Sequence, residues 1–184
     1  MSLPKPDSGF ASLREALEGI EVPREIRNTL VLSTVSYLSF DGLIHSGQLV
    51  IHQELESEVK AIFAELRSIE FPIEKVIPIG AYGWDDEASM ADNNSSAFNY
   101  RFILGTTRLS NHSFGRALDL NPMLNPYNAR DGKVHPPGAT HNPAVPGTLF
   151  KGSEAVRIFT ERGWIWGGNW TVPVDYQHLE KPTS

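Results

Sequence analysis

The residues best suited to chemistry in this sequence are two histidines and an aspartate in its C-terminal half. His112 and Asp119 lie seven residues apart, and the small residues Gly115 and Ala117 lie between them. A strand or tight hairpin there can bring both side chains to one point. Imidazole and carboxylate are common zinc ligands, and a catalytic zinc site has three protein ligands with a fourth position left open. His178, in a short extended segment near the C-terminus, is the best candidate for the third ligand.

A second carboxylate precedes this third candidate. Asp175 lies three residues before His178. A water molecule activated by zinc needs a base within hydrogen-bond reach to take its proton as it attacks a carbonyl. Residues three apart do not share a face of a flat strand, so the Asp-x-x-His segment must bend for both to reach one site. We therefore predict a general base at Asp175.

Composition narrows the possible functions. The chain has no cysteine, which excludes disulfides, thiolate metal sites and a cysteine nucleophile, so any metal must be held by the six histidines and by carboxylates. The net charge is -6 and no run of Lys or Arg occurs, so we do not expect a nucleic-acid partner. A small or peptidic substrate fits this composition better.

The length of 184 residues suits a single domain covering 1–184, in which residues 1–9, rich in Pro and Ser, are expected to form a loose N-terminal tail. No stretch approaches the roughly 20 apolar residues of a membrane span. The start also lacks the apolar run of about 7–15 residues found in a signal peptide. We therefore expect no membrane span, and any export signal to be missing from this sequence.

Periodicity predicts an α+β fold with a small antiparallel sheet and flanking helices. The clearest helix covers 54–69, where apolar residues recur at steps of three and four. Other expected helices cover 10–18 and 154–162, and expected strands cover 30–40, 48–52, 76–81 and 97–104. Turns are expected at 41–42 and 46–47, a polar loop at 85–96, and a long irregular loop at 121–147.

The motif around the first two candidate ligands resembles a known peptidase family. Ser110–Asp119 fits the pattern S-x-H-x-x-G-x-A-x-D at every fixed position. Asp175–His178 resembles the closing D/E-x-x-H element of the zinc D-alanyl-D-alanine carboxypeptidase (VanY-like) family, which includes L-alanyl-D-glutamate endopeptidases and shares its zinc fold with hedgehog. The resemblance directly covers about residues 98–180. The tail Asp-x-x-His-hydrophobic-Glu looks closest to the endopeptidase branch.

The resemblance implies a role for each matching residue. His112, Asp119 and His178 would bind Zn²⁺, and Asp175 would be the general base. The family also uses an arginine to polarise the scissile carbonyl, and the best match is Arg101, on the strand expected before the motif. Ser110 is a candidate for binding substrate.

The implied activity is hydrolysis of an amide bond in peptidoglycan stem peptides by a zinc-activated water. Two alternatives remain open: a D,D-carboxypeptidase or dipeptidase of the same family, and a zinc-stabilised cell-wall binding module without hydrolysis. The expected partner is a peptidoglycan peptide. The expected location is the cell envelope or the extracellular space, with the cytoplasm as the alternative. The sequence does not predict an oligomeric state.

Overall fold

A long β-hairpin organises the N-terminal half of the protein. The computed structural model describes residues 6–103 and 105–183. Strands β1 (Leu30–Leu38) and β2 (Ile44–His52) pair antiparallel along their whole length, from Leu30 opposite His52 to Leu38 opposite Ile44. The turn expected at 46–47 is wrong, because residues 39–43 already reverse the chain and Ser46 and Gly47 pair with β1 inside β2.

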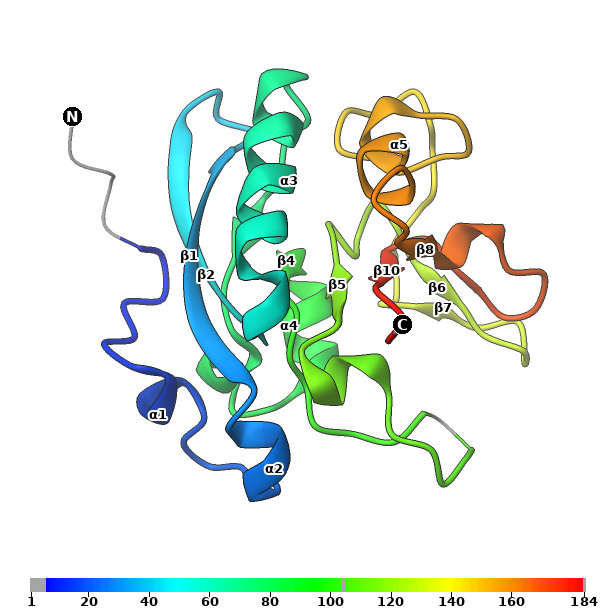
Figure 1. Cartoon of the computed structure of the whole chain (residues 1–184). Helices are drawn as coiled ribbons and strands as arrows, with labels where there is room; N and C mark the ends of the chain where they lie inside the picture. Colours follow the sequence, from blue (N-terminus) through cyan, green and yellow to red (C-terminus); the bar gives the residue numbers. More distant parts are fainter. Residues whose placement is uncertain (1–5, 104, 184) are drawn as a thin grey trace.

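Helix α3 (Glu56–Ser68) packs on this hairpin (Figure 1). It follows a single 3-10 turn, η1 (Gln53–Leu55), so the helix predicted over 54–69 is confirmed apart from its ends. Its apolar stripe, which includes Ile62 and Phe63, is fully buried. Two short helices, α1 (Leu13–Ala16) and α2 (Arg24–Arg27), precede the hairpin.

The C-terminal half is built from very short strands. One antiparallel sheet has the order β5 (Ala117–Asp119), β10 (His178–Glu180), β8 (Ile165–Trp166). A second has the order β7 (Val134–His135), β6 (Tyr127–Asn128), β9 (Val174–Asp175). Helix α5 (Glu154–Thr160) lies beside the first sheet and packs on α3. Few helices and small antiparallel sheets confirm the predicted α+β class.

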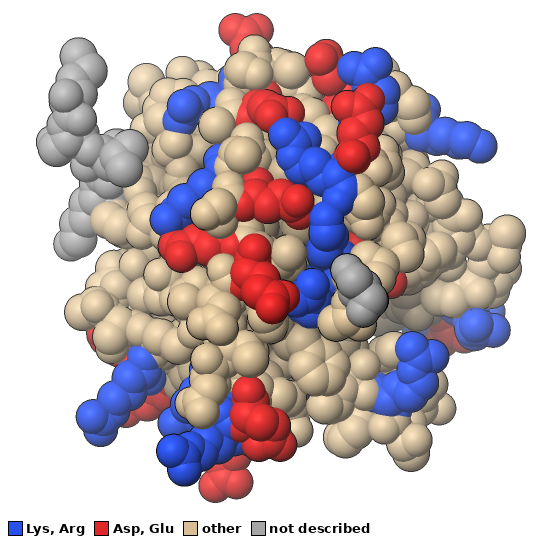
Figure 2. Space-filling model, in the orientation of Figure 1, with Lys and Arg blue, Asp and Glu red and all other residues tan. Residues whose placement is uncertain are grey.

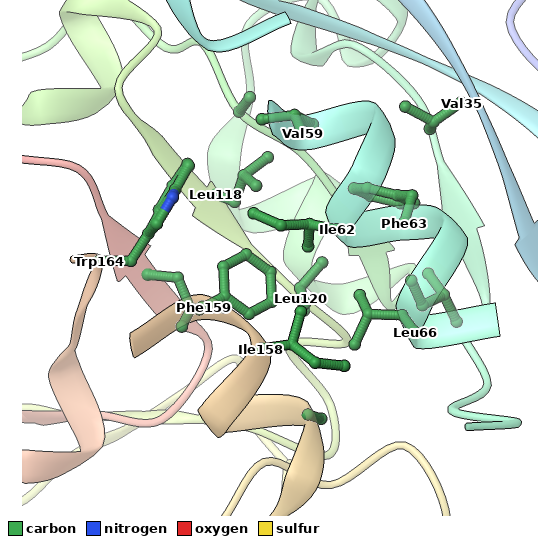
Figure 3. Close-up of a cluster of buried hydrophobic side chains, with 14 of the residues drawn as sticks. Val35, Val59, Ile62, Phe63, Leu66, Leu118, Leu120, Ile158, Phe159 and Trp164 are labelled. Carbon is green, nitrogen blue, oxygen red and sulfur yellow. The ribbon is translucent and has the colours of Figure 1, made fainter. Parts of the chain in front are cut away.

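The main core joins the two halves. Ile62 of α3, Leu118 of β5 and Phe159 of α5 meet in one buried cluster with Trp164 (Figure 3). The rings of Phe159 and Trp164 lie 5.5 Å apart edge to face, and the Trp164 indole donates a hydrogen bond of 2.7 Å to Glu58 of α3. Strand β5 therefore lies on a packed platform made by both helices.

Three expectations for the middle of the chain are wrong. Only β3 (Lys75–Val76) of the strand expected at 76–81 forms, paired parallel to β4 (Asn94–Ser95), and a 3-10 turn, η2 (Ile79–Tyr82), follows Pro78. The loop expected at 85–96 contains helix α4 (Asp86–Ala91), because Asp85 caps it by accepting a bond of 3.0 Å from the Ala88 amide. Within residues 97–103 only a single bridge at Phe102 forms, and position 104 lies outside the described residues.

Two buried asparagines hold the long loop over 121–147 in place. Asn121 donates to the carbonyls of Pro72 and Gly147, at 2.9 and 3.0 Å. Asn125 also donates to Gly147, at 3.0 Å, and accepts a bond of 2.7 Å from the Leu149 amide. The loop is therefore fixed to the rest of the fold, although only the two-residue strands β6 and β7 form within it.

The tail expected at 1–9 is attached to the hairpin in its described part. The Asp7 amide donates a bond of 2.9 Å to the Ser46 carbonyl, and the Asp7 carboxylate accepts one of 2.5 Å from Tyr37. Ser8 also donates to Gln48. Residues 1–5 lie outside the described residues.

The surface in Figure 2 mixes acidic and basic side chains without a broad basic area. None of the helices within the described residues is long and apolar enough to cross a membrane.

Candidate metal site

A short 3-10 turn carries His112, the first of the three candidate ligands. Ser110 caps a 3-10 turn, η3 (Asn111–Phe114), and its hydroxyl accepts a hydrogen bond of 3.3 Å from the His112 amide. Gly115 ends the turn with φ +64°, a conformation that favours glycine. A Cβ there would lie 2.5 Å from the His52 nitrogen of β2, so the motif glycine also permits close backbone packing. The chain then enters β5 and reaches Asp119.

Strand pairing brings the third residue to the other two. In the β5–β10 ladder His178 lies directly opposite Asp119, although 59 residues separate them in sequence. Opposed residues of an antiparallel pair have their side chains on the same face of the sheet. The ladder register is therefore what places His178 beside Asp119.

The donor atoms converge closely. His112 Nε2 lies 3.1 Å from His178 Nδ1 and 3.2 Å from Asp119 Oδ2, and His178 Nδ1 lies 3.2 Å from Asp119 Oδ1. All three residues are buried, with at most 8% of their surface exposed. Among the described residues they form the one group of this kind that could hold a metal ion. Two imidazoles and one carboxylate are a donor set suited to zinc.

Each histidine has its other ring nitrogen occupied. His112 Nδ1 contacts the carbonyl oxygen of Ala97, and His178 Nε2 lies 3.0 Å from Glu180 Oε2. If both nitrogens carry protons toward these acceptors, the lone pairs of His112 Nε2 and His178 Nδ1 point at the shared centre. This tautomer assignment is the one that metal binding requires.

The electrostatics of the three residues show how strongly these groups interact. Burial alone would raise the pKa of Asp119, but His112 and His178 outweigh it and hold that pKa well below its usual range. Burial alone would lower the pKa of His178, but Asp119 and Glu180 raise it to about 10. The site thus stabilises positive charge beside the Asp119 carboxylate.

Asp175, the second carboxylate of interest, lies on β9 opposite Tyr127 of β6. Its Oδ1 is buried and has no hydrogen-bond partner among the described residues. Burial is the main reason that its pKa is raised to about 7; Asp119 adds to the increase, while His178, His112 and Arg101 oppose it. Gly167, in the 3-10 turn η4 (Gly167–Asn169), permits the approach of this strand, because a Cβ there would lie 2.6 Å from the Asp175 carbonyl oxygen and 3.3 Å from the His178 Cβ.

Arg101 lies near Asp175 but not on the expected strand. Its backbone exchanges two hydrogen bonds with the Ser113 hydroxyl, at 2.9 and 2.8 Å, which fix it to η3. Its guanidinium Nε lies 3.3 Å from Asp86 Oδ2 in α4, and the side chain is 39% exposed. The charge of Arg101 acts on both Asp175 and Tyr127, which lie opposite each other on β9 and β6.

Ser110 has a structural contact that accounts for its presence. It is buried, its hydroxyl caps η3, and its amide donates a bond of 3.0 Å to the Arg101 carbonyl. Its predicted role in substrate binding stays a prediction.

Sequence reasoning overlooked several residues around the site. The ring of Trp170 lies 5.4 Å from that of His178, and Asn111 donates a bond of 2.8 Å to Glu180. Only the position of Trp170 in a Trp-rich stretch beside the Asp-x-x-His segment hinted at such a contact. His141 of the long loop stacks on Tyr176 at 3.7 Å and bonds a backbone carbonyl, so it has a structural role.

Comparison with known proteins agrees with the site. No curated protein and no solved structure matches the chain. Residues 104–181 match the family described as D-alanyl-D-alanine carboxypeptidase, and the matched segment contains all three candidate ligands and Asp175. The match supports a peptidase. The motif and the geometry of the site agree with this similarity over residues 104–181.

Proposed function

We propose that this protein is a zinc metallopeptidase that hydrolyses an amide bond in peptidoglycan stem peptides. The observation that carries the proposal is the convergence of three donor atoms from His112, Asp119 and His178 beside Asp175, whose Oδ1 has no hydrogen-bond partner among the described residues. The donor set suits zinc. A buried carboxylate oxygen that is not engaged by another side chain can take a proton from a water molecule. The residues present therefore fit the metal that the family uses.

Each residue would have a distinct task. His112 Nε2, His178 Nδ1 and an Asp119 carboxylate oxygen would hold the ion. Zinc, when bound, supplies Lewis-acid polarisation of the scissile carbonyl and makes the attacking water more acidic. Asp175 would take the proton from that water and later give it to the leaving amine.

Arg101 would balance the negative charge that develops on the carbonyl oxygen. Its side chain is only partly exposed and its charge already acts on Asp175, so it lies within electrostatic range of the reaction. When substrate binds, the ion pair between Arg101 and Asp86 would either break or hold the guanidinium in the orientation that the carbonyl oxygen requires.

The first test is the metal content of the purified protein by mass spectrometry. We expect one zinc ion per chain in the wild type and loss of that ion in His112→Ala. His45→Ala is the matched control, because His45 also bonds a carboxylate, at 2.9 Å, but lies outside the site. Absence of metal in the wild type after zinc is added back would overturn the proposal.

The second test separates a peptidase from a zinc-stabilised binding module. Asp175→Asn should keep the zinc ion and lose hydrolysis of stem peptides, because asparagine cannot accept the proton. An active Asp175→Asn enzyme would show that Asp175 is not the base. A wild type that binds zinc and stem peptides without cleaving them would favour the binding module.

The bond that is cut is the finer question. The matched family description favours a D,D-carboxypeptidase, whereas the aspartate at 175 favours the endopeptidase branch. Stem peptides with free and with extended C-termini distinguish the two. The proposal implies that the protein acts in the cell envelope or outside the cell, where peptidoglycan lies.

A further inference from the structure

The candidate metal site has an outer hydrogen-bond chain that the proposed mechanism leaves unused. From His178 Nε2 a bond of 3.0 Å leads to Glu180 Oε2, and the same oxygen accepts a bond of 2.8 Å from Asn111 Nδ2. The Glu180 side chain is 20% exposed, so solvent reaches it only in part. We propose that Glu180, held by Asn111, is a positioning residue that fixes the His178 ring with its Nδ1 lone pair toward the metal; this inference rests on the proposed metal site.

Strand geometry explains why Glu180 can do this. Residues two apart on a strand share one face, and His178 and Glu180 are the first and last residues of β10. Backbone pairing holds both ends of that strand, with His178 opposite Asp119 and Glu180 opposite Ala117. The carboxylate is therefore held beside the imidazole by the same ladder that places the imidazole beside Asp119.

Asn111 links this carboxylate to the other histidine. It precedes His112 in η3, and 69 residues separate it from Glu180. The bond thus ties the turn that carries one ligand to the strand that carries another. A carboxylate behind a metal-bound histidine fixes the tautomer and increases the basicity of the ring.

The two histidines differ in the hydrogen-bond acceptor that their second ring nitrogen contacts. His112 has a neutral acceptor, the Ala97 carbonyl oxygen, whereas His178 has a carboxylate. Removing the Glu180 carboxylate should therefore change metal affinity through the His178 ring and through the bond that ties η3 to β10. Partners of this kind typically contribute about 10–100-fold in metal affinity.

The test is zinc affinity by chelator competition for the wild type, Glu180→Ala, Glu180→Gln and Asn111→Ala. We expect Glu180→Ala to bind zinc about 10–100-fold more weakly. Glu180→Gln should recover part of that loss, because its amide oxygen still accepts the bond without the charge. Asn111→Ala should lie between Glu180→Gln and the wild type.

Glu58→Gln is the matched control. Glu58 is also a partly buried glutamate that accepts a bond from an aromatic ring N–H, that of Trp164 at 2.7 Å, yet it does not contact the site. A Glu180→Ala variant that binds zinc as tightly as Glu58→Gln would overturn the inference. Circular dichroism at the same temperature establishes that each variant is folded, and Glu180→Gln, nearly isosteric, covers the case in which Glu180→Ala fails to fold.

A second readout is the exchange rate of the His178 Nε2 proton, followed by NMR in the zinc-loaded protein. The proton should be protected in the wild type and exchange faster in Glu180→Ala. Zinc binding that depends on Glu180 in a protein without peptidase activity would support the inference and refute the proposed function. Full peptidase activity with unchanged zinc affinity in Glu180→Ala would support the proposed function and refute the role of Glu180. A wild type that binds no zinc would overturn both the proposed function and the role of Glu180.

Discussion

Replacement of Gly115 by alanine tests how the motif is built into the fold. Gly115 has φ +64°, and an added Cβ would lie 2.5 Å from the His52 nitrogen and 2.8 Å from the Ile51 carbonyl carbon. Both are backbone atoms of β2 in the long hairpin, so they cannot rotate away as a side chain would. The Gly115 carbonyl also accepts a bond of 2.9 Å from the His52 amide. Alanine must therefore displace η3 from the hairpin.

The cost has two parts that can be separated. A left-handed conformation costs an L-residue about 1–2 kcal/mol. Overpacking against a fixed backbone adds about 1–3 kcal/mol. Gly115→Ala should therefore lower the free energy of unfolding by about 2–5 kcal/mol, which corresponds to about 4–20 °C in Tm for a chain of this size.

Gly132→Ala is the matched control for this prediction. Gly132 also has a positive φ, +82°, but a Cβ there would have no atom within 4 Å. It should lose only the conformational part, about 1–2 kcal/mol. Thermal unfolding by circular dichroism gives both values. Equal losses in the two variants would refute the steric argument, and unchanged zinc affinity in Gly115→Ala would refute the idea that the contact with β2 positions His112.

Three further predictions concern the base, the core and the long loop. Asp175 must be ionised to accept a proton, so kcat/KM should fall as the pH decreases through the pKa of Asp175. Burial raises that pKa to about 7, and a bound cation lowers it. An acidic limb of kcat/KM centred above about pH 7 would therefore contradict the assignment. Phe159→Ala should lower stability by about 3–5 kcal/mol in urea titration, because it removes a fully buried ring packed against Trp164. Asn125→Ala should lower the free energy of unfolding by about 2–4 kcal/mol in the same assay, because it leaves the buried Leu149 amide and nearby carbonyls unpaired. A decrease of less than about 1 kcal/mol would show that this side chain does not fix the loop over 121–147.

The elements predicted well are those whose sequence pattern extends over many consecutive residues. The helix over 54–69 has four turns of apolar periodicity, and the nine-residue strand from Leu30 contains four β-branched or aromatic residues. The three candidate ligands were found by a fixed spacing within one motif and by a short second motif. The structure brings those three residues together, which neither motif alone required.

The elements that were missed depend on contacts distant in sequence. Strands such as β3 and β8 are two residues long and exist only because a partner strand lies beside them. The capping role of Asp85 was hidden in a polar stretch that otherwise resembles a loop. The bond between Asn111 and Glu180 spans 69 residues, so no window of sequence contains both.

The site also depends on residues outside the segment that matches the family. The matched segment begins at residue 104, yet the acceptor behind His112 is the carbonyl oxygen of Ala97. The Asn99 amide donates a bond of 3.2 Å to the His112 carbonyl, and the Phe98 amide donates one of 3.1 Å to Val50 of β2. The hairpin thus supports the segment that orients His112. The ten-residue motif contains two of the three proposed ligands, while the N-terminal half of the fold fixes where the donor atom of one of them points.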